Sequence, residues 1–142
     1  MTVKPETKFG NEITKNIKAV WLPFTITVTA GIPDLIGIKN GVVIFLELKC
    51  IKQNSINISP FQISLNSNIF DACRKSYFLV KHIEQRIIKL YEGNKGKELK
   101  ESGFRVPCIV EMRPSYDWNA LRDYLFPPPM CFDEFEYNPD LD

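Results

Sequence analysis

The chain has 142 residues, of which 44% are apolar and 25% charged, as expected for one globular domain that buries a core without disulfides. Its four cysteines lie far apart and are accompanied by a single histidine, which argues against a zinc site and favours scattered reduced thiols. Five acids and no Lys or Arg follow Cys131, so a basic body precedes an acidic tail. That asymmetry is compatible with a polyanionic partner.

Targeting signals are not evident in the sequence. Residues 1–10 contain no apolar run of the length that a signal peptide needs, and charges break every apolar stretch before membrane-spanning length. We therefore expect a cytoplasmic protein with no membrane partner. We see no internal repeat and predict a single domain over residues 1–130, followed by an acidic C-terminal tail over 131–142.

The N-terminal region predicts a helix followed by a strand. Residues 5–20 carry apolar side chains at helical spacing, namely Phe9, Ile13, Ile17 and Val20. Residues 22–28 alternate apolar and polar side chains, a pattern typical of a strand.

Two apolar runs then flank Asn40-Gly41, the strongest short signal for a β-hairpin with a two-residue turn. The polar stretch 50–59 predicts a loop. Ser59, Pro60 and Gln62 supply the N-cap, the first-turn proline and the capping-box partner of a helix that should run to about residue 74.

The second half predicts a shorter alternation of elements. We expect a strand over 77–80, and a helix over 82–91 that turns Ile83, Ile87 and Ile88 inward. A polar, lysine-rich loop or frayed helix end should follow. Residues 106–112 predict a strand that Pro107 restricts to a sheet edge, and residues 117–125 a last helix that ends before three prolines.

Asp34 and Glu47 are the only acids between residues 13 and 70, and the hairpin brings them together. With the turn at Asn40-Gly41, Asp34 faces Glu47 as a non-hydrogen-bonded pair, with Cβ atoms roughly 4.5–5.5 Å apart. The side-chain period of two places Lys49 on the same face as Glu47. Facing carboxylates repel, and charges at the end of an otherwise apolar strand are costly unless they have a task.

A bound divalent cation would reverse that repulsion. Oxygens from adjacent strands, completed by water and phosphate oxygens, form a ligand set that Mg²⁺ accepts. Such an ion polarises a phosphate and lowers the pKa of a bound water, while Lys49 beside it could orient the water or neutralise charge. Taken singly, each motif also has an ordinary structural reading, because Asp is common in turns and Glu-x-Lys on strand surfaces.

The order of these residues resembles the signature of the PD-(D/E)xK nuclease superfamily, with Pro33-Asp34 followed by Glu47-Leu48-Lys49. The finer pattern adds Gly31 before it and Ser59 with Gln62 after it. This pattern is similar to that of stand-alone virus-type replication-repair nucleases (VRR-NUC), many of them phage-borne. The resemblance covers roughly residues 5–80 and leaves the C-terminal region unexplained.

The resemblance implies an α/β fold with a restriction-endonuclease-like core, in which a mixed central β-sheet is flanked by α-helices. It also implies metal-dependent phosphodiester hydrolysis with Mg²⁺, for which Mn²⁺ would substitute. Asp34 and Glu47 would be metal ligands, the backbone carbonyl of Leu48 a further ligand, and Lys49 the catalytic lysine. Gln62 would support the active site, although helix capping alone also explains it.

Nucleases of this kind often recruit a glutamate from the first helix, for which Glu6 and Glu12 are the candidates. At about 100° per residue, the apolar face of residues 9–20 centres close to Glu6, whereas Glu12 lies roughly a quarter-turn away. We therefore prefer Glu6 as the catalytic and metal-binding carboxylate. Both also fit as solvent-facing acids near a helix N-terminus.

Basic residues outside this group are candidates for phosphate contacts: Lys52, Arg74, Lys75, Lys81, Arg86, Lys89, Lys95, Lys97, Lys100 and Arg105. We predict nucleic-acid binding by Lys52, Arg74 and Lys75, with Lys52 best placed just beyond the active strand. From residue 81 the lysines are interleaved with glutamates, which favours a solvated face. We interpret the single histidine, His82, as structural.

The leading hypothesis is a metal-dependent DNA endonuclease, structure-selective for Holliday junctions or other branched DNA, that acts as a homodimer in phage-type replication or recombination. A phage-encoded protein would work in the host cytoplasm. Recognition of DNA shape is favoured because we see no separate specificity domain. The alternatives are a restriction-like or nicking endonuclease, or a non-catalytic DNA-binding subunit with the nuclease fold. No nucleotide cofactor is expected, because the chain has no Walker-type or Gly-x-Gly-x-x-Gly loop.

Overall fold

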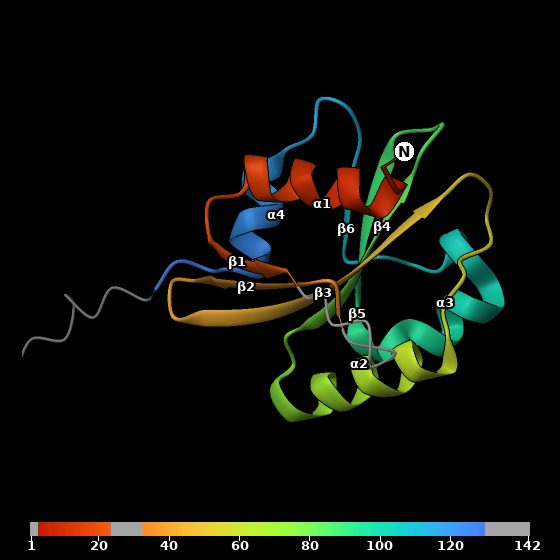
Figure 1. Cartoon of the computed structure of the whole chain (residues 1–142), viewed down its shortest axis with the longest axis horizontal. Helices are drawn as coiled ribbons and strands as arrows, with labels where there is room; N and C mark the ends of the chain where they lie inside the picture. Colours follow the sequence, from red (N-terminus) through yellow and green to blue (C-terminus); the bar gives the residue numbers. More distant parts are fainter. Residues whose placement is uncertain (1–2, 24–32, 130–142) are drawn as a thin grey trace, which may run out of the picture.

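The computed structural model describes residues 3–23 and 33–129. In these residues a mixed six-stranded sheet is flanked by four α-helices, which confirms the predicted α/β class (Figure 1). The elements are α1 (Pro5–Asn16), β1 (Val20–Pro23), β2 (Leu35–Lys39), β3 (Val42–Ile51), α2 (Pro60–Cys73), β4 (Ser76–His82), β5 (Ile87–Glu92), the 3-10 turn η1 (Gly93–Lys95), α3 (Gly96–Ser102), the 3-10 turn η2 (Gly103–Arg105), β6 (Val110–Met112) and α4 (Trp118–Leu125).

The strands follow chain order across the sheet, from β1 to β6. All neighbours are antiparallel except β3 and β4, which are parallel and are joined by α2. A parallel pair needs a crossover connection, and a helix is its usual form. This crossover places the N-terminus of α2 close to the C-terminal part of β3.

The β2–β3 hairpin forms as predicted around Asn40-Gly41. Both turn residues have positive φ, 54° and 75°, the conformation that Asn-Gly favours in two-residue hairpin turns. The pairing runs from Lys39–Val42 to Leu35–Leu46, which is the predicted register. Asp34 therefore lies one residue beyond the last pair of the ladder, at the level of Glu47.

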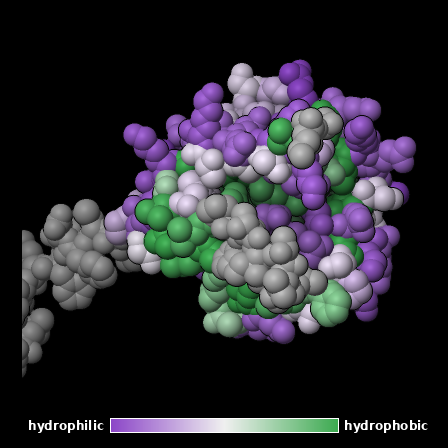
Figure 2. All heavy atoms as spheres, in the orientation of Figure 1, coloured by the Kyte–Doolittle hydropathy of each residue, from purple (hydrophilic) through white to green (hydrophobic). Residues whose placement is uncertain are grey.

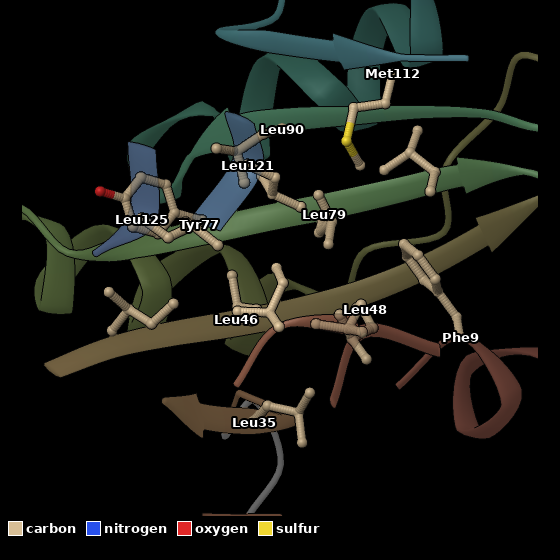
Figure 3. Close-up of a cluster of buried hydrophobic side chains, with 14 of the residues drawn as sticks. Phe9, Leu35, Leu46, Leu48, Tyr77, Leu79, Leu90, Met112, Leu121 and Leu125 are labelled. Atoms are coloured by element: carbon tan, nitrogen blue, oxygen red, sulfur yellow. The ribbon is translucent and has the colours of Figure 1, made fainter. Parts of the chain in front are cut away.

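Two apolar layers sandwich the sheet. On one face, α1 and α4 contribute Phe9, Ile13, Leu121 and Leu125 to a cluster that includes Leu46 and Leu79. Figure 3 shows Phe9, Leu121 and Leu125 converging with Leu46, Leu48 and Leu79. On the other face, Ile51, Phe78, Val80 and Tyr91 pack with Leu99 of α3. Among the helices in the described ranges, none is long and apolar enough to cross a membrane.

The half of the sheet near the hairpin keeps apolar side chains exposed. Val20 and Val43 both pair with Ile38 and are 59% and 43% exposed, and Leu22 on the same strand as Val20 is 48% exposed. Figure 2 shows apolar surface over this end of the molecule. The sheet is thus most completely buried at β3–β5, where helices pack on both faces.

The predicted helix over 82–91 is wrong, because these residues form the turn between β4 and β5 and most of β5. His82 pairs with Ile87 and Tyr77 with Glu92 in an antiparallel ladder, and Arg86 takes a positive φ of 58° in the turn. Ile87 and Ile88 fit either period in so short an apolar run, and periodicity alone cannot separate them. Their β-branched side chains suit the strand that the sheet offers.

Other boundaries also differ from expectation. Helix α1 ends at Asn16, because Ile17 is extended (φ −119°, ψ 111°) and Val20 already belongs to β1. Strand β3 runs through Ile51, so the loop begins two residues later than predicted.

The region after β5 is more ordered than predicted, since residues 93–105 form η1, α3 and η2. Strand β6 begins only at Val110, at the predicted sheet edge. The remainder of the predicted strand 22–28 and the acidic tail 131–142 lie outside the described residues.

Helix α2 starts and stops as predicted. The Ser59 hydroxyl accepts from the Gln62 backbone N–H, the Gln62 side chain accepts from the Ser59 N–H, and Pro60 begins the helix. The helix ends at Cys73, and Arg74 follows with a left-handed φ of 61°.

Gly37 provides a test of the packing between β1, β2 and the segment after α4. A Cβ at this position would lie 2.6 Å from Trp21 Cζ3 and 2.8 Å from Phe126 Cζ. Gly37→Ala should therefore lower the free energy of unfolding by about 1–3 kcal/mol, as overpacking does. Urea denaturation followed by circular dichroism measures this.

Gly10→Ala is the matched control, because its Cβ would meet only Leu48 Cδ1 at 3.3 Å inside a helix that favours Ala. Equal unfolding free energies for the two variants would contradict the packing described at Gly37.

Candidate active site

Asp34 lies at an edge that β2 leaves open on β3. Because β2 begins at Leu35, its ladder with β3 stops at Leu46, while β3 continues to Ile51 with β4 on its other side. Asp34 Oδ2 accepts a 2.8 Å hydrogen bond from the Leu48 backbone N–H. The N–H and C=O of one strand residue point to the same side, so the Leu48 carbonyl also faces this edge.

Gln62 joins the catalytic candidates of β3 to the N-terminus of α2. Its Nε2 donates to Glu47 Oε1 at 2.7 Å, and its Oε1 accepts from Lys49 Nζ at 3.0 Å and from the Ser59 N–H at 3.0 Å. Lys49 Nζ also lies 3.8 Å from Glu47 Oε1. One side chain therefore serves both interpretations left open by the sequence, helix capping and support of the site.

The site concentrates negative charge in a buried place. Glu47 is only 2% exposed, and burial together with the charge of Asp34 raises its pKa to about 8 against the opposing effect of Lys49. Burial also raises the pKa of Asp34, opposed by the Leu48 hydrogen bond and by Lys49. The second carboxyl oxygen of Glu47, Oε2, is buried and has no hydrogen-bond partner in the structure.

These features fit a divalent cation. A buried carboxyl oxygen without a partner is costly, and a cation beside it would supply the missing interaction and offset the repulsion from Asp34. Within residues 3–23 and 33–129, no three His, Cys, Asp or Glu side chains form a group that could hold a metal. The candidate donors are the Asp34 and Glu47 carboxyl groups and the Leu48 carbonyl, and Mg²⁺ commonly binds through one or two carboxylates, waters and substrate phosphates.

The structure separates the two helix glutamates. Glu6 shares a cavity of about 540 Å³ with Asp34 and Leu48, and its charge contributes to the raised pKa of both Asp34 and Glu47. Glu12 instead forms an ion pair with Lys81, with Oε1 and Nζ 3.0 Å apart. The geometry favours Glu6 as the carboxylate nearer the site.

The predicted DNA contacts lie at different distances from this site. Lys52 is exposed and follows β3 directly. Arg74 caps the opposite end of α2 from Gln62, which at 1.5 Å per residue is about 18 Å away, and its guanidinium lies 5.1 Å from the centre of the Phe70 ring. The Lys75 carbonyl accepts from Phe45 N–H beside it. Arg74 is thus separated from Gln62 by the length of α2, whereas the Lys75 backbone lies beside Phe45, two residues before Glu47 on β3, and the role of both residues in DNA binding stays a prediction.

Sequence reasoning missed Asn66, which supports Gln62 from the next turn of α2. Asn66 is fully buried, and its side-chain Nδ2 donates to the backbone carbonyl of Gln62 at 2.8 Å. The backbone carbonyl of Asn66 accepts from Ser76 Oγ at 2.7 Å. A polar residue four positions after Gln62, on its helical face, was the available signal.

Comparison with known protein families and with curated proteins gives no match for this chain.

Ser59 and Gln62 allow the capping function to be separated from support of the site. Ser59→Ala removes the cap alone and should lower the free energy of unfolding by about 0.5–2 kcal/mol. Gln62→Ala keeps the backbone N–H that Ser59 accepts from, but it removes the acceptor of the Ser59 N–H and the donor to Glu47 Oε1, so we expect a loss about 1–3 kcal/mol larger than that of Ser59→Ala. Urea denaturation of both variants in EDTA measures the difference, and equal losses would show that the contact with Glu47 contributes nothing.

Proposed function

We propose that this protein is a Mg²⁺-dependent endonuclease that hydrolyses phosphodiester bonds in DNA. The observation that carries the proposal is the buried Glu47 Oε2, which has no hydrogen-bond partner among the described residues. The other oxygen of this carboxyl group lies 3.8 Å from Lys49 Nζ, and the next residue, Leu48, binds the Asp34 carboxyl group through its backbone N–H. The resemblance to PD-(D/E)xK nucleases supports the assignment, since its motif residues meet at one place in the fold.

In this proposal, one group of side chains binds the metal ion and another contacts the substrate. A divalent cation held here would polarise the scissile phosphate and lower the pKa of a water. Asp34, Glu47 and the Leu48 carbonyl would hold the cation, with Glu6 as a further carboxylate in the same cavity. Mn²⁺, which also accepts oxygen ligands, is expected to substitute for Mg²⁺.

Lys49 is oriented toward this chemistry by Gln62. A lysine ammonium has three donors, and one is used by the 3.0 Å bond to Gln62 Oε1. The remaining N–H groups are free to bind a non-bridging phosphate oxygen and stabilise the charge that grows there as the P–O bond breaks. Asn66 and Ser59 hold Gln62 and act as positioning residues.

The substrate part of the proposal is branched DNA, cut by a homodimer as in Holliday junction resolution. Almost all the described elements are strands of the sheet or helices that flank it, which favours recognition of DNA shape over base sequence. Restriction-like or nicking activity, and a DNA-binding subunit without catalysis, are the alternative outcomes of the test below.

Cleavage assays test this proposal directly. The purified protein with Mg²⁺ or Mn²⁺ should cut a labelled four-way junction in preference to linear duplex or single strands, and EDTA should abolish cutting. Glu47→Ala, Asp34→Ala and Lys49→Ala should each reduce the rate at least about a hundredfold, as loss of a metal ligand or charge-stabilising group does.

Glu6→Ala and Glu12→Ala form a matched pair on α1. Glu6→Ala should slow cleavage, whereas Glu12→Ala should leave the rate nearly unchanged, because Glu12 pairs with Lys81 away from the site. Tight DNA binding without cleavage in either metal, by folded protein, would refute the catalytic assignment and favour the binding subunit.

Cation binding has a readout that does not depend on activity. Mg²⁺ or Mn²⁺ should raise the Tm, because a cation that binds the folded Asp34–Glu47 pair stabilises the folded protein by RT ln(1 + [L]/Kd). Differential scanning fluorimetry measures this shift. Glu47→Gln should abolish it, while Glu12→Gln should preserve it, and an equal shift in both variants would contradict metal binding at Glu47.

A further inference from the structure

A second polar cavity, of about 420 Å³, lies away from the carboxylates. It is bordered by the loop after β3, the turn between β4 and β5, and η2. Its cationic lining residues come from three separate segments and are Lys52, Lys89 and Arg105. Glu84 is the one acid among the lining residues in the described part of the chain.

His82 gives this cavity a buried hydrogen-bond donor. The residue is 6% exposed, and its Nδ1 accepts from the Gln85 backbone N–H at 3.1 Å. In the neutral ring the proton therefore resides on Nε2. Nε2 has no protein partner among the described residues and is not fully buried, and His82 lines the cavity, so we take this N–H as the group that the ring offers to a ligand there.

The three cations differ in how firmly they are held. Lys89 is fixed, because its Nζ donates to the Phe104 carbonyl at 2.8 Å and lies 4.2 Å from the centre of the Phe104 ring. It also lies 3.9 Å from Glu111 Oε1. Lys52 and Arg105 are exposed and form no ion pair within the described residues. The cavity thus offers Lys89, which is held in place by its contacts, two exposed cationic side chains, and the N–H donor of an imidazole ring.

We propose that this cavity is a phosphate-binding site that holds a backbone phosphate of bound DNA at a distance from the cleavage site. Lysine, arginine and N–H donors that converge on one cavity are the groups that recognise a phosphate oxyanion. The DNA part of this inference rests on the proposed function, whereas the capacity to bind phosphate does not.

The sheet sets the spacing between the two sites. Lys49 pairs with Val80, and Val80 pairs with Lys89, so the three residues form one row across the sheet. Two strand spacings place the Lys49 and Lys89 Cα atoms about 10 Å apart. The second site would therefore hold a phosphate of the same DNA segment whose bond is cut.

The single histidine provides a specific reporter of this site. In untagged, isotope-labelled protein, the His82 ring gives the only imidazole signals, so heteronuclear NMR follows them without assignment ambiguity. Titration with inorganic phosphate at constant ionic strength should move these signals saturably. Arg105→Ala and Lys52→Ala should each weaken the phosphate affinity about tenfold, as loss of one charge-assisted hydrogen bond does.

Lys97→Ala is the matched control, because Lys97 is an exposed lysine of α3 that does not line the cavity. It should leave the phosphate affinity unchanged. An unmoved His82 signal in phosphate, or equal weakening by Lys97→Ala and Arg105→Ala, would overturn the proposed site whatever the nuclease assays show.

The DNA arm uses full-length Glu47→Ala protein, so that substrate is bound and not cut. A four-way junction should move the His82 signals, and adding Arg105→Ala should reduce the slope of log affinity against log salt by about one. A response to phosphate with none to DNA would overturn the DNA contact and indicate a site for free phosphate. Loss of cleavage alone would refute the proposed function and leave the phosphate site standing.

Discussion

The Asn40-Gly41 turn is the constraint on which the candidate site depends. A two-residue turn fixes the register of β2 on β3, and a slip of one residue would move Glu47 and Lys49 to the opposite face. In the observed register, β2 begins one residue after Asp34, and β3 continues past it as an open edge. The same local geometry therefore places the Asp34 carboxyl group beside the Leu48 backbone and at the level of Glu47.

The parallel pairing of β3 with β4 supplies the other half of the site. A crossover helix must return the chain to the start of β4, and α2 does so with its capped N-terminus beside Glu47 and Lys49. The residue that completes the capping box also donates to one oxygen, Oε1, of the buried Glu47 carboxyl group. Helix initiation and orientation of the lysine consequently depend on the same Gln62 amide, so a change at this position affects fold and site together.

Local rules predicted those parts of the molecule where one sequence signal had one structural meaning. Asn-Gly, the Ser-Pro-x-Gln cap and the alternation of charge in β3 each specify a turn, a helix start or a face, and the structure follows them. The helix predicted over residues 82–91 failed because Ile87 and Ile88 satisfy a helical as well as an extended pattern. The extended structure forms because β4 offers an edge with which residues 87–92 can pair, and a short stretch of sequence does not reveal such a pairing partner.

The same distinction explains which functional residues were found. Asp34, Glu47 and Lys49 belong to one hairpin, so pairing arithmetic alone relates them. Lys52 was predicted to bind DNA, but Lys89 and Arg105 come from two other segments, where interleaved glutamates made a solvated surface the simpler interpretation. Most of those glutamates lie elsewhere once β4, β5 and η2 assemble, since Glu98 of α3 pairs with Lys95 of η1 and Glu84 is the one acid among the described residues that line the cavity.

The two sites place their charges in opposite ways on the same sheet. At the edge of β3, burial raises the pKa of both carboxyl groups, and the charge of Asp34 raises that of Glu47 further, so a cation would stabilise this site. At the far end of β4 and β5, cationic side chains gather around the His82 ring, and an anion would stabilise that site. A phosphodiester chain with its metal ion carries both charges. If the proposed function holds, a sheet that keeps the two sites about two strand spacings apart would be complementary to a metal-bound DNA strand, and the spacing would be set by backbone pairing, the most rigid part of the fold.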